Sequence, residues 1–286
     1  MVKKCSDIYN NNKYNNIFNE YPFELDHFQK HTIEGIENNV HVLNTAHTGS
    51  GKTLGAEYII KKFCSMGKKV IYTSPIKSLS NQKFYEFNKK FPEISFGILT
   101  GDIKFNPEAD CLIMTTEILR NFVFQKKMDN VPLYFEMNIE DLAWVIFDEV
   151  HYINDIERGK VWEETMISLP NHTRFLLLSA TINRPIEFAQ WIETITGNDV
   201  WYASTNKRVV PLTHYSYLTL RSKLSEVHGR NDKIVDNEIS KPIVLKDANQ
   251  MINNTNYNKV KHIADYFSKN RLYVNHTFVL NSIVSY

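Results

Sequence analysis

Short apolar runs alternate with amphipathic stretches from about residue 40 to residue 203 of this chain. The apolar runs are rich in β-branched residues, which is typical of strands buried on both faces of a sheet. They predict strands at Val40–Thr45, Lys69–Ser74, Ser95–Leu99, Cys111–Thr115, Trp144–Phe147, Arg174–Ser179 and Val200–Ala203. The stretches between them predict helices at Lys52–Met66, Lys77–Phe91, Glu117–Phe124, Val161–Ser168 and Pro185–Thr196. This alternation predicts an open α/β fold with a mainly parallel sheet, helices on both faces and ligands at the carboxyl ends of the strands.

The two ends of the chain lack this alternation. Residues 1–20 are rich in Asn and poor in apolar residues, so we expect a low-complexity, loosely ordered lead-in before a helix within residues 21–36. After Pro211 the pattern degrades, and residues 222–260 are polar enough to predict a linker or insertion. Helical periodicity returns weakly at Val260–Phe267 and at Val274–Val284.

Charge and cysteine content narrow the possible partners. The net charge of +1 gives no overall basic surface, so any contact with nucleic acid must come from local patches. Three cysteines without metal-ligand spacing suit a reducing compartment. No apolar run approaches membrane-spanning length, and the polar start is not a secretory signal. We therefore expect an intracellular protein without a membrane partner.

The loop AHTGSGKT, residues 46–53, carries the clearest chemistry in the chain. It fits the phosphate-binding pattern G-x-x-x-x-G-K-[ST], with Ala in place of the first Gly, and lies between a predicted strand and a predicted helix. Glycines let the backbone turn its N–H groups onto a polyanion, while the lysine reaches the β- and γ-phosphates and the last hydroxyl holds Mg²⁺. A Gly/Ser hinge that happens to precede Lys is the alternative, and this context argues against it. The predicted nucleotide contacts in the loop are Thr48, Gly49, Ser50, Gly51, Lys52 and Thr53.

Two later strands end in residues that suit the same site. WVIFDEVH, residues 144–151, delivers Asp148 as a second Mg²⁺-holding acid and Glu149 as a group that orients or deprotonates water. Many strands end in solvated acids, so this signal is strong only together with the phosphate loop. LLLSAT, residues 176–181, ends in small hydroxyl residues. Capping of the next helix by Thr181 or Asn183 is an alternative role that is compatible with a site nearby.

The phosphate loop, the DEVH segment and the SAT triplet resemble motifs I, II and III of superfamily 2 helicases. The segments between them resemble the superkiller-type DExH-box RNA helicases, which feed RNA to the exosome. The resemblance covers roughly residues 20–215 and rests on TSPIKSLSNQKF, ILTGDIKFNPEADCLIMTTEILR, DEVHYINDIERGKVWEE, LSATINRPIEFAQWI and STNKRVVPLTHY. It implies a RecA-like P-loop NTPase domain that uses ATP and Mg²⁺.

The resemblance also implies roles for single residues. Phe23 stacks on the adenine ring, and Gln29 reads the edge of the base. Lys52, Asp148 and Glu149 match the catalytic residues, with Thr53 and Asp148 at the metal. Ser179 and Thr181 match the triplet that links hydrolysis to domain movement. The positions that line the RNA path match Pro75, Lys77, Asn81, Thr100, Gly101, Thr115, Thr116 and Arg120. Small hydroxyls, glycine N–H groups and a few basic side chains suit sequence-independent backbone contacts, although Lys77, Asn81 and Arg120 taken singly would fit a solvated helix face.

The chain departs from the family pattern after residue 215. A helicase of this superfamily needs a second RecA-like domain that supplies an arginine finger in a QxxGRxxR-like motif. That motif is absent from the sequence, and His228-Gly229-Arg230 is an incidental match. We therefore expect a lead-in over residues 1–20, one RecA-like domain over 21–215, a linker over 216–270 and the start of a second, truncated RecA-like domain over 271–286. Losing an arginine finger costs about 10³–10⁵ in rate, so we expect ATP binding with slow turnover and no unwinding by this chain alone.

Two other functions stay open at this point. A DNA helicase or translocase shares the same motifs, although ERG-x-VWEE and TSPIKSLSNQKF favour RNA and the RNA-decay machinery. A non-catalytic, nucleotide-dependent RNA-binding module is the other alternative. The intact Lys52, Asp148 and Glu149 argue against it for a full-length parent protein but not for this truncated chain.

Overall fold

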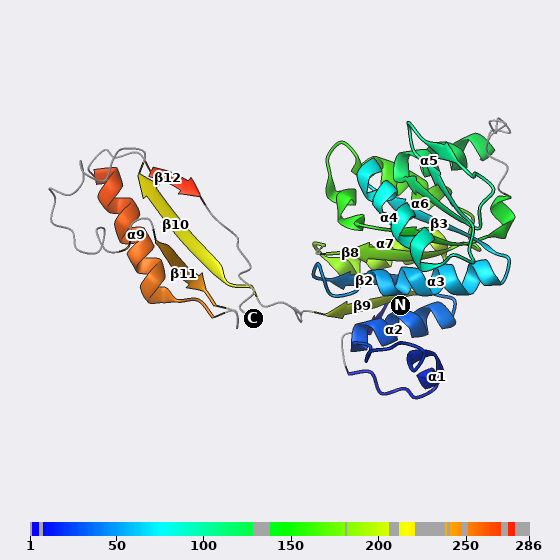
Figure 1. The fold of residues 1–286 in the computed structure, drawn as a ribbon, viewed down its shortest axis with the longest axis horizontal. Helices are drawn as coiled ribbons and strands as arrows, with labels where there is room; N and C mark the ends of the chain where they lie inside the picture. The colour runs from blue at the N-terminus through cyan, green and yellow to red at the C-terminus, as the bar shows by residue number, and fades with distance from the viewer. Residues whose placement is uncertain are drawn as a thin grey trace. The chain divides into compact units, whose positions relative to one another are not determined.

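The computed structural model describes residues 2–5, 8–127, 138–180, 182–205, 212–220, 238, 241–247, 251–269 and 274–277. The chain divides into two compact units, Met1–Lys207 and Arg208–Tyr286. Each unit has its own sheet (Figure 1). None of the helices in the described ranges is long and apolar enough to cross a membrane.

A nine-stranded sheet forms the centre of the first unit, in the order β1-β9-β2-β8-β7-β3-β6-β4-β5. Neighbouring strands are parallel except for the antiparallel pair β4–β5. The predicted mainly parallel sheet is therefore confirmed. The strands are β1 Lys3–Cys5, β2 His41–Ala46, β3 Lys69–Ser74, β4 Phe96–Leu99, β5 Lys104–Phe105, β6 Cys111–Thr115, β7 Leu142–Phe147, β8 Arg174–Ser179 and β9 Val200–Thr205.

Helices cover both faces of this sheet. Successive residues of the central strands point to opposite sides, so each face presents apolar side chains against which helices pack. Residues from α2, α3 and α4 pack with one set of strand residues in one buried cluster. Residues from α5, α6 and α7 pack with the alternate set in another. The helices are α1 Asn15–Phe18, α2 His27–Glu37, α3 Thr53–Ser65, α4 Lys77–Lys90, α5 Thr116–Lys127, α6 Gly159–Ser168 and α7 Pro185–Thr196, with 3₁₀ turns η1 Ile139–Asp141 and η2 Val150–Asn154.

The N-terminal segment differs from the loose order that we expected for residues 1–20. Strand β1 pairs in parallel with β9, and Lys3 lies opposite Trp201. Tyr14 and Phe18 are buried in a small apolar cluster that also contains residues of α2 and α3. Scattered aromatic side chains thus anchor a segment whose Asn content predicts little burial.

The second unit contains a three-stranded antiparallel sheet in the order β11-β10-β12. Its elements are β10 His214–Leu220, β11 Pro242–Lys246, α9 Asn254–Lys269 and β12 Val274–Thr277. Helix α9 contains the predicted helical stretch Val260–Phe267, and packs Ile263 and Phe267 against Leu218 and Ile243. The helix predicted at Val274–Val284 is wrong for its first four residues, which pair with β10 as a strand, and the remainder lies outside the described residues.

Candidate functional site

The predicted site residues follow the carboxyl ends of neighbouring strands in the first unit. The phosphate loop follows β2, Ser179 ends β8, and Asp148 and Glu149 follow β7. The predicted RNA-path residues lie after β3, at the end of β6 and after β4. These six strands are consecutive in the order β2-β8-β7-β3-β6-β4. Because parallel strands end at one edge, the nucleotide residues occupy one half of this edge and the RNA-path residues the other half.

The phosphate loop has the conformation that its glycines allow. Gly49 and Gly51 have φ of 82° and 78°, in the left-handed region that L side chains rarely adopt. The Ser50 hydroxyl donates to the His47 carbonyl at 2.5 Å and closes the turn. Helix α3 starts directly after the loop with no side-chain cap, so N–H groups of its first turn remain available to an anion.

Gln29 ties helix α2 to this loop. Its side-chain oxygen accepts from the Asp26 N–H at 2.9 Å in a capping box, and its Nε2 donates to the Gly51 carbonyl at 3.2 Å. Reading of a base edge by Gln29 stays a prediction. Phe23 is 55 % exposed and, with Leu54 and Tyr58 of α3, lines a pocket of about 290 Å³.

Three charged groups interact where β2 and β7 end. The Lys52 ammonium donates to the carbonyls of Ala46 and His47 at 2.7 and 3.3 Å. Burial lowers the pKa of Lys52, and Glu149 and Asp148 oppose that shift. Burial also raises the pKa of Glu149, and the negative charge of Asp148 adds to the rise. The charges of both acids therefore act on the pKa of Lys52, and the charges of Asp148 and Lys52 act on the pKa of Glu149.

Among the described residues, the Asp148 carboxylate is held by two hydrogen bonds from the protein, whereas the Glu149 carboxylate is not. Asp148 accepts one hydrogen bond from the hydroxyl of the fully buried Tyr72 and another from the Glu149 N–H at 2.9 Å. Glu149 has φ 53°, a strained value for a residue with a side chain. Its buried Oε2 lies 3.3 Å from His151 Nδ1 and makes no hydrogen bond with the described residues. Tyr72 was missed from the sequence, because it looks like any apolar residue of β3.

These residues fit a nucleotide-bound Mg²⁺. Carboxylate and hydroxyl oxygens are the ligands that Mg²⁺ prefers, and it usually keeps waters and phosphate oxygens as its other ligands. Asp148 supplies a carboxylate whose orientation is fixed from two sides, and Thr53 supplies a hydroxyl at the first position of α3. The buried Oε2 of Glu149, which makes no hydrogen bond with the described residues, suits a group that accepts a proton from water.

The SAT triplet is only partly described. Ser179 is fully buried at the end of β8, and its hydroxyl makes no hydrogen bond with the described residues. Thr181 lies outside the described residues. Helix α7 begins after Arg184, which has φ 52° and provides no side-chain cap, so the alternative in which Asn183 caps this helix is wrong.

An open hollow of about 530 Å³ brings four predicted RNA-path residues together: Pro75, Lys77, Gly101 and Thr115. The other four differ in their surroundings. Thr100 and Thr116 are buried at its border, and Asn81 Oδ1 is buried without a hydrogen bond to the described residues. Arg120 forms an ion pair with Glu164 of α6 and does not line this hollow. Arg158 of the ERG-x-VWEE segment does line it, although the resemblance assigned no RNA-path role to that residue.

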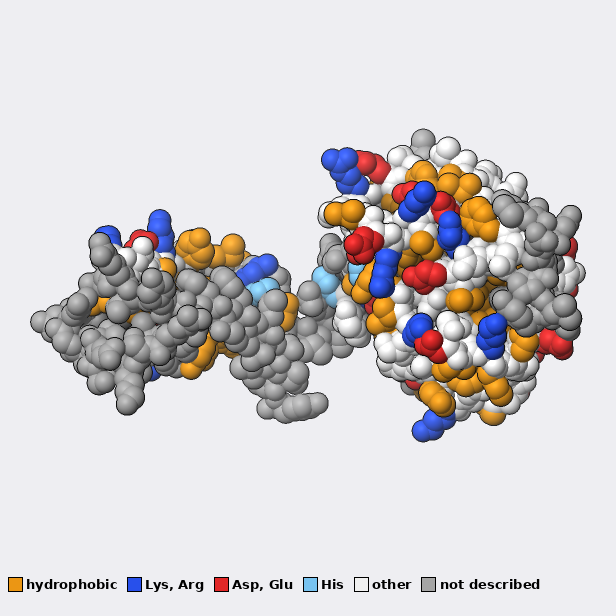
Figure 2. All heavy atoms as spheres, turned by 90° about the horizontal axis from the view of Figure 1, so that it is seen from above, with side chains coloured by type: hydrophobic (Ala, Val, Ile, Leu, Met, Phe, Trp, Pro, Cys, Tyr) orange, Lys and Arg blue, Asp and Glu red, His pale blue; other side chains and the backbone are white. Residues whose placement is uncertain are grey.

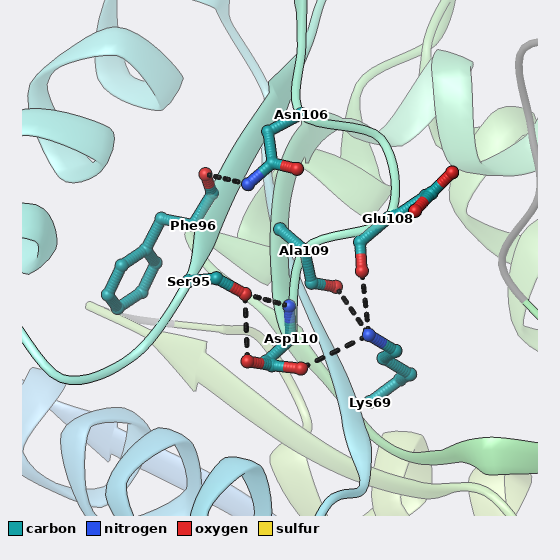
Figure 3. Close-up of polar contacts among 7 residues, drawn as sticks. All are labelled: Lys69, Ser95, Phe96, Asn106, Glu108, Ala109 and Asp110. Atoms are coloured by element: carbon teal, nitrogen blue, oxygen red, sulfur yellow. Dashed lines mark hydrogen bonds and ion pairs between the residues drawn. The ribbon is translucent and has the colours of Figure 1, made fainter.

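A polar cluster fixes the base of the β4–β5 hairpin that carries Thr100 and Gly101 (Figure 3). Lys69 Nζ donates to Glu108 O at 2.7 Å and lies 3.1 Å from Asp110 Oδ1. Asp110 also accepts from the Ser95 hydroxyl at 2.8 Å. Partial burial alone would raise the pKa of Asp110, but the hydrogen bonds from Ser95 and Lys69 lower it. The hairpin is therefore held at the end opposite to the hollow.

Charges of both signs lie on the face of the first unit that Figure 2 shows. On the face of the first unit in Figure 2, basic, acidic and hydrophobic side chains are interspersed and form no large area of one sign. Any nucleic-acid contact on that face therefore depends on individual side chains.

The chain is similar to helicases in sequence and in fold. Residues 26–189 match the family described as DEAD/DEAH box helicase. The chain is 49 % identical to the antiviral helicase SKI2 of Saccharomyces cerevisiae over 192 residues, which are 67 % of this chain and 14 % of that protein. It is 48 % identical to the human superkiller complex protein 2 over 71 % of this chain and 16 % of that protein. It is 43 % identical to the human exosome RNA helicase MTR4 over 81 % of this chain and 21 % of that protein.

The chain thus spans about a fifth or less of the length of these relatives. Two solved structures share its fold. A crystal structure of the DUF1998 helicase MrfA bound to DNA superposes with a TM-score of 0.53 at 17 % identity, over 68 % of this chain and 29 % of that chain. The Mycobacterium smegmatis helicase Lhr, bound to ssDNA and AMP-PNP, has a TM-score of 0.50 at 21 % identity, over 62 % of this chain and 25 % of that chain.

Proposed function

Because this chain belongs to the DEAD/DEAH box helicase family, we propose that it is the ATP-binding first motor domain of an ATP-dependent RNA helicase of the superkiller and exosome-associated type. One observation carries the proposal. Lys52 follows β2 and the acids Asp148 and Glu149 follow β7, and the charges of both acids act on the pKa of Lys52. Lys52 stands beside a loop with two glycines of positive φ and at the start of a helix without a side-chain cap.

In phosphoryl transfer to water, separate residues of this chain bind the phosphates, hold the metal ion and activate the water. The loop residues Thr48 to Gly51 and the first turn of α3 bind the phosphates through backbone N–H groups. Lys52 leaves its loop carbonyls to neutralise phosphate oxygens. Thr53 and Asp148 hold Mg²⁺, which when bound screens the charge on the phosphates. Glu149 orients water and accepts its proton, and the raised pKa of Glu149 favours that transfer.

Adenine is bound beside α3. We assign the stacking contact to Phe23, which is exposed above the Leu54–Tyr58 pocket, and the base-edge contact to Gln29, which already lies against the loop. Ser179 and Thr181 link hydrolysis to domain movement. These assignments rest on the sequence resemblance and on the position of the described residues at one edge of the sheet.

The other half of this edge binds RNA. The hollow with Pro75, Lys77, Gly101 and Thr115 supports backbone contacts, and Asn81, Thr100, Thr116 and Arg120 complete the proposed path at its border. Two relatives are named as superkiller or exosome proteins, and we extend that association with RNA-decay machinery to this chain, inside the cell.

Turnover by the chain itself is slow in this proposal. The motor domain predicted over residues 21–215 corresponds to the first compact unit, Met1–Lys207. The residues predicted as a linker, 216–270, and as the start of a second RecA-like domain, 271–286, fall together in the second unit. We assign the arginine finger to a second RecA-like domain. The 286 residues contain no QxxGRxxR-like motif to supply that arginine, which is worth about 10³–10⁵ in rate.

Competition between RNA and DNA tests the substrate. A labelled single-stranded RNA is titrated with the chain in the presence of Mg²⁺ and AMP-PNP, then displaced with RNA or DNA of the same sequence. We expect RNA to displace the label at lower concentration than DNA. Equal or better displacement by DNA would favour a DNA translocase. ATP turnover is measured alongside, and rapid RNA-stimulated turnover by this chain would contradict the need for a second domain.

A further inference from the structure

The open hollow with Pro75, Lys77, Gly101 and Thr115 is also lined by an arginine to which the sequence resemblance assigned no RNA-path role. Arg158 follows the DEVH segment and lines the hollow together with Pro75, Lys77, Gly101 and Thr115. Its side chain is exposed, and its Nη1 donates to the Pro75 carbonyl at 3.5 Å. A residue from the segment after β7 thus reaches the segment after β3.

Arg158 differs from Lys77 and Arg120 because those two side chains form ion pairs with carboxylates. Lys77 is paired with Asp102 at 2.5 Å, and Arg120 is paired with Glu164. Across the described part of the chain, no carboxylate forms an ion pair with Arg158. A phosphate would therefore meet an uncompensated guanidinium at Arg158, whereas Lys77 must first leave an existing partner. Glu117 also lines the hollow and keeps its overall charge low, so the position of Arg158 matters more than net attraction.

The turn that presents Arg158 is built rigidly. The Asp155 side chain accepts from the N–H groups of Glu157 and Arg158 at 3.0 and 2.9 Å, and the Gly159 N–H donates to the Asp155 carbonyl at 2.8 Å. A Cβ on Gly159 would lie 2.1 Å from the Ile153 carbonyl, so only glycine lets this turn pack against η2.

Backbone hydrogen bonds connect this turn to Glu149, the acid that we propose orients water. The Tyr152 N–H donates to the Glu149 carbonyl at 3.1 Å, and the Asp155 N–H donates to the Tyr152 carbonyl at 3.0 Å. A short run of backbone hydrogen bonds therefore joins Glu149 to the turn that holds Arg158.

We propose that Arg158 binds a backbone phosphate of the nucleic acid strand in this hollow. This inference rests on the proposed RNA function of the same edge. Guanidinium groups bind phosphate through paired N–H donors, and such contacts position a strand without reading its sequence. The contact would lie between the Pro75 turn and the tip of the β4–β5 hairpin.

The test compares Arg158→Gln with Lys160→Gln, in the whole chain with Mg²⁺ and AMP-PNP. Both variants lose one positive charge within the same three residues, but Lys160 is 80 % exposed and does not line the hollow. Binding of a single-stranded RNA is measured over a range of salt concentrations. We expect Arg158→Gln to bind roughly tenfold more weakly at low salt and to lower the slope of log affinity against log salt by about 0.7, the value for one phosphate on a single strand. Lys160→Gln should keep the affinity within about twofold and the slope unchanged.

Arg158→Lys separates charge from geometry. It should keep the salt slope and recover only part of the affinity, because lysine lacks the paired donors. AMP-PNP affinity should be unchanged in all three variants, which confirms that each is folded. If the unaltered chain binds RNA and Arg158→Gln binds it with the same affinity and slope, the role of Arg158 is wrong. If the unaltered chain binds no RNA, the proposed function of the whole edge fails instead.

Discussion

Gly51→Ala tests whether the conformation of the phosphate loop, and not only its charge, binds the nucleotide. Gly51 has φ 78°, and a Cβ there would lie 2.6 Å from Nε2 of Gln29. Gln29 cannot move without cost, because its amide bonds both the Asp26 N–H and the Gly51 carbonyl. The substitution therefore strains the loop and displaces the side chain that ties it to α2.

The magnitude follows from two contributions. A side chain in the left-handed region costs about 1–2 kcal/mol. Loss of one or two hydrogen bonds of Gln29 adds about 0.5–1.5 kcal/mol each. The two contributions sum to about 1.5–5 kcal/mol. If about half of this total falls on the bound state, Mg²⁺·ATP affinity drops by roughly three- to sixtyfold, since about 1.4 kcal/mol is a factor of ten.

Gly197→Ala is the matched control. Gly197 ends α7 with φ 66°, and no atom lies within 4 Å of the Cβ that would be added. This variant carries the backbone strain alone, far along the chain from the loop. It should lose stability by about 1 kcal/mol, or roughly 2–4 °C in Tm, and bind Mg²⁺·ATP like the unaltered chain.

The assay is isothermal titration with Mg²⁺·AMP-PNP, together with thermal unfolding of each variant. A folded Gly51→Ala variant with unaltered affinity would refute the reasoning. So would equal losses of affinity in the Gly51 and Gly197 variants, because strain in general would then be responsible.

Three further predictions concern the acids of the site and of the hairpin base. Glu149→Gln should keep Mg²⁺·ATP binding and remove turnover in the protein that includes the second motor domain, and unchanged hydrolysis there would mean that another group activates water. Tyr72→Phe should raise the Mg²⁺ concentration needed for ATP binding, because Asp148 loses the hydrogen bond from the buried hydroxyl. The control is Tyr202→Phe, which removes a hydroxyl bonded to Thr45 and should leave the Mg²⁺ requirement unchanged. Asp110→Asn should lower stability by about 0.5–1 kcal/mol at neutral pH, a small figure because Asp110 is partly exposed. The folded pKa of Asp110 lies below its ordinary value of 3.8, so this difference should persist above pH 4 and vanish as the pH falls through the folded pKa; urea titrations that show a constant difference down to pH 2 would contradict it.

The sequence predicts the central part of the fold well, for a physical reason. Strands such as Lys69–Ser74 and Arg174–Ser179 are buried on both faces, so their apolar runs mark them within a residue or so. The phosphate loop and the DEVH segment follow such strands, and the edge on which they meet is set by the parallel topology.

What the sequence does not reveal depends on contacts between distant segments. Strand β1 is identified only by pairing with β9, and the N-terminal aromatic residues only by packing on α2 and α3. Tyr72 is recognised as a partner of Asp148 only when β3 and β7 are placed side by side. Arg158 belongs to a quoted segment, but its approach to Pro75 depends on a turn that local pattern cannot predict.

The most direct test of the account is a titration of the chain with Mg²⁺·ATP, compared with the Lys52→Ala variant. The Lys52 ammonium donates to two loop carbonyls and is favoured by the charges of both acids, so it should be required for tight binding. We expect saturable binding by the unaltered chain and loss of tight binding in the variant, with both proteins folded. Equal binding by the two, or no binding by the unaltered chain, would contradict the claim that this edge of the sheet is an ATP site.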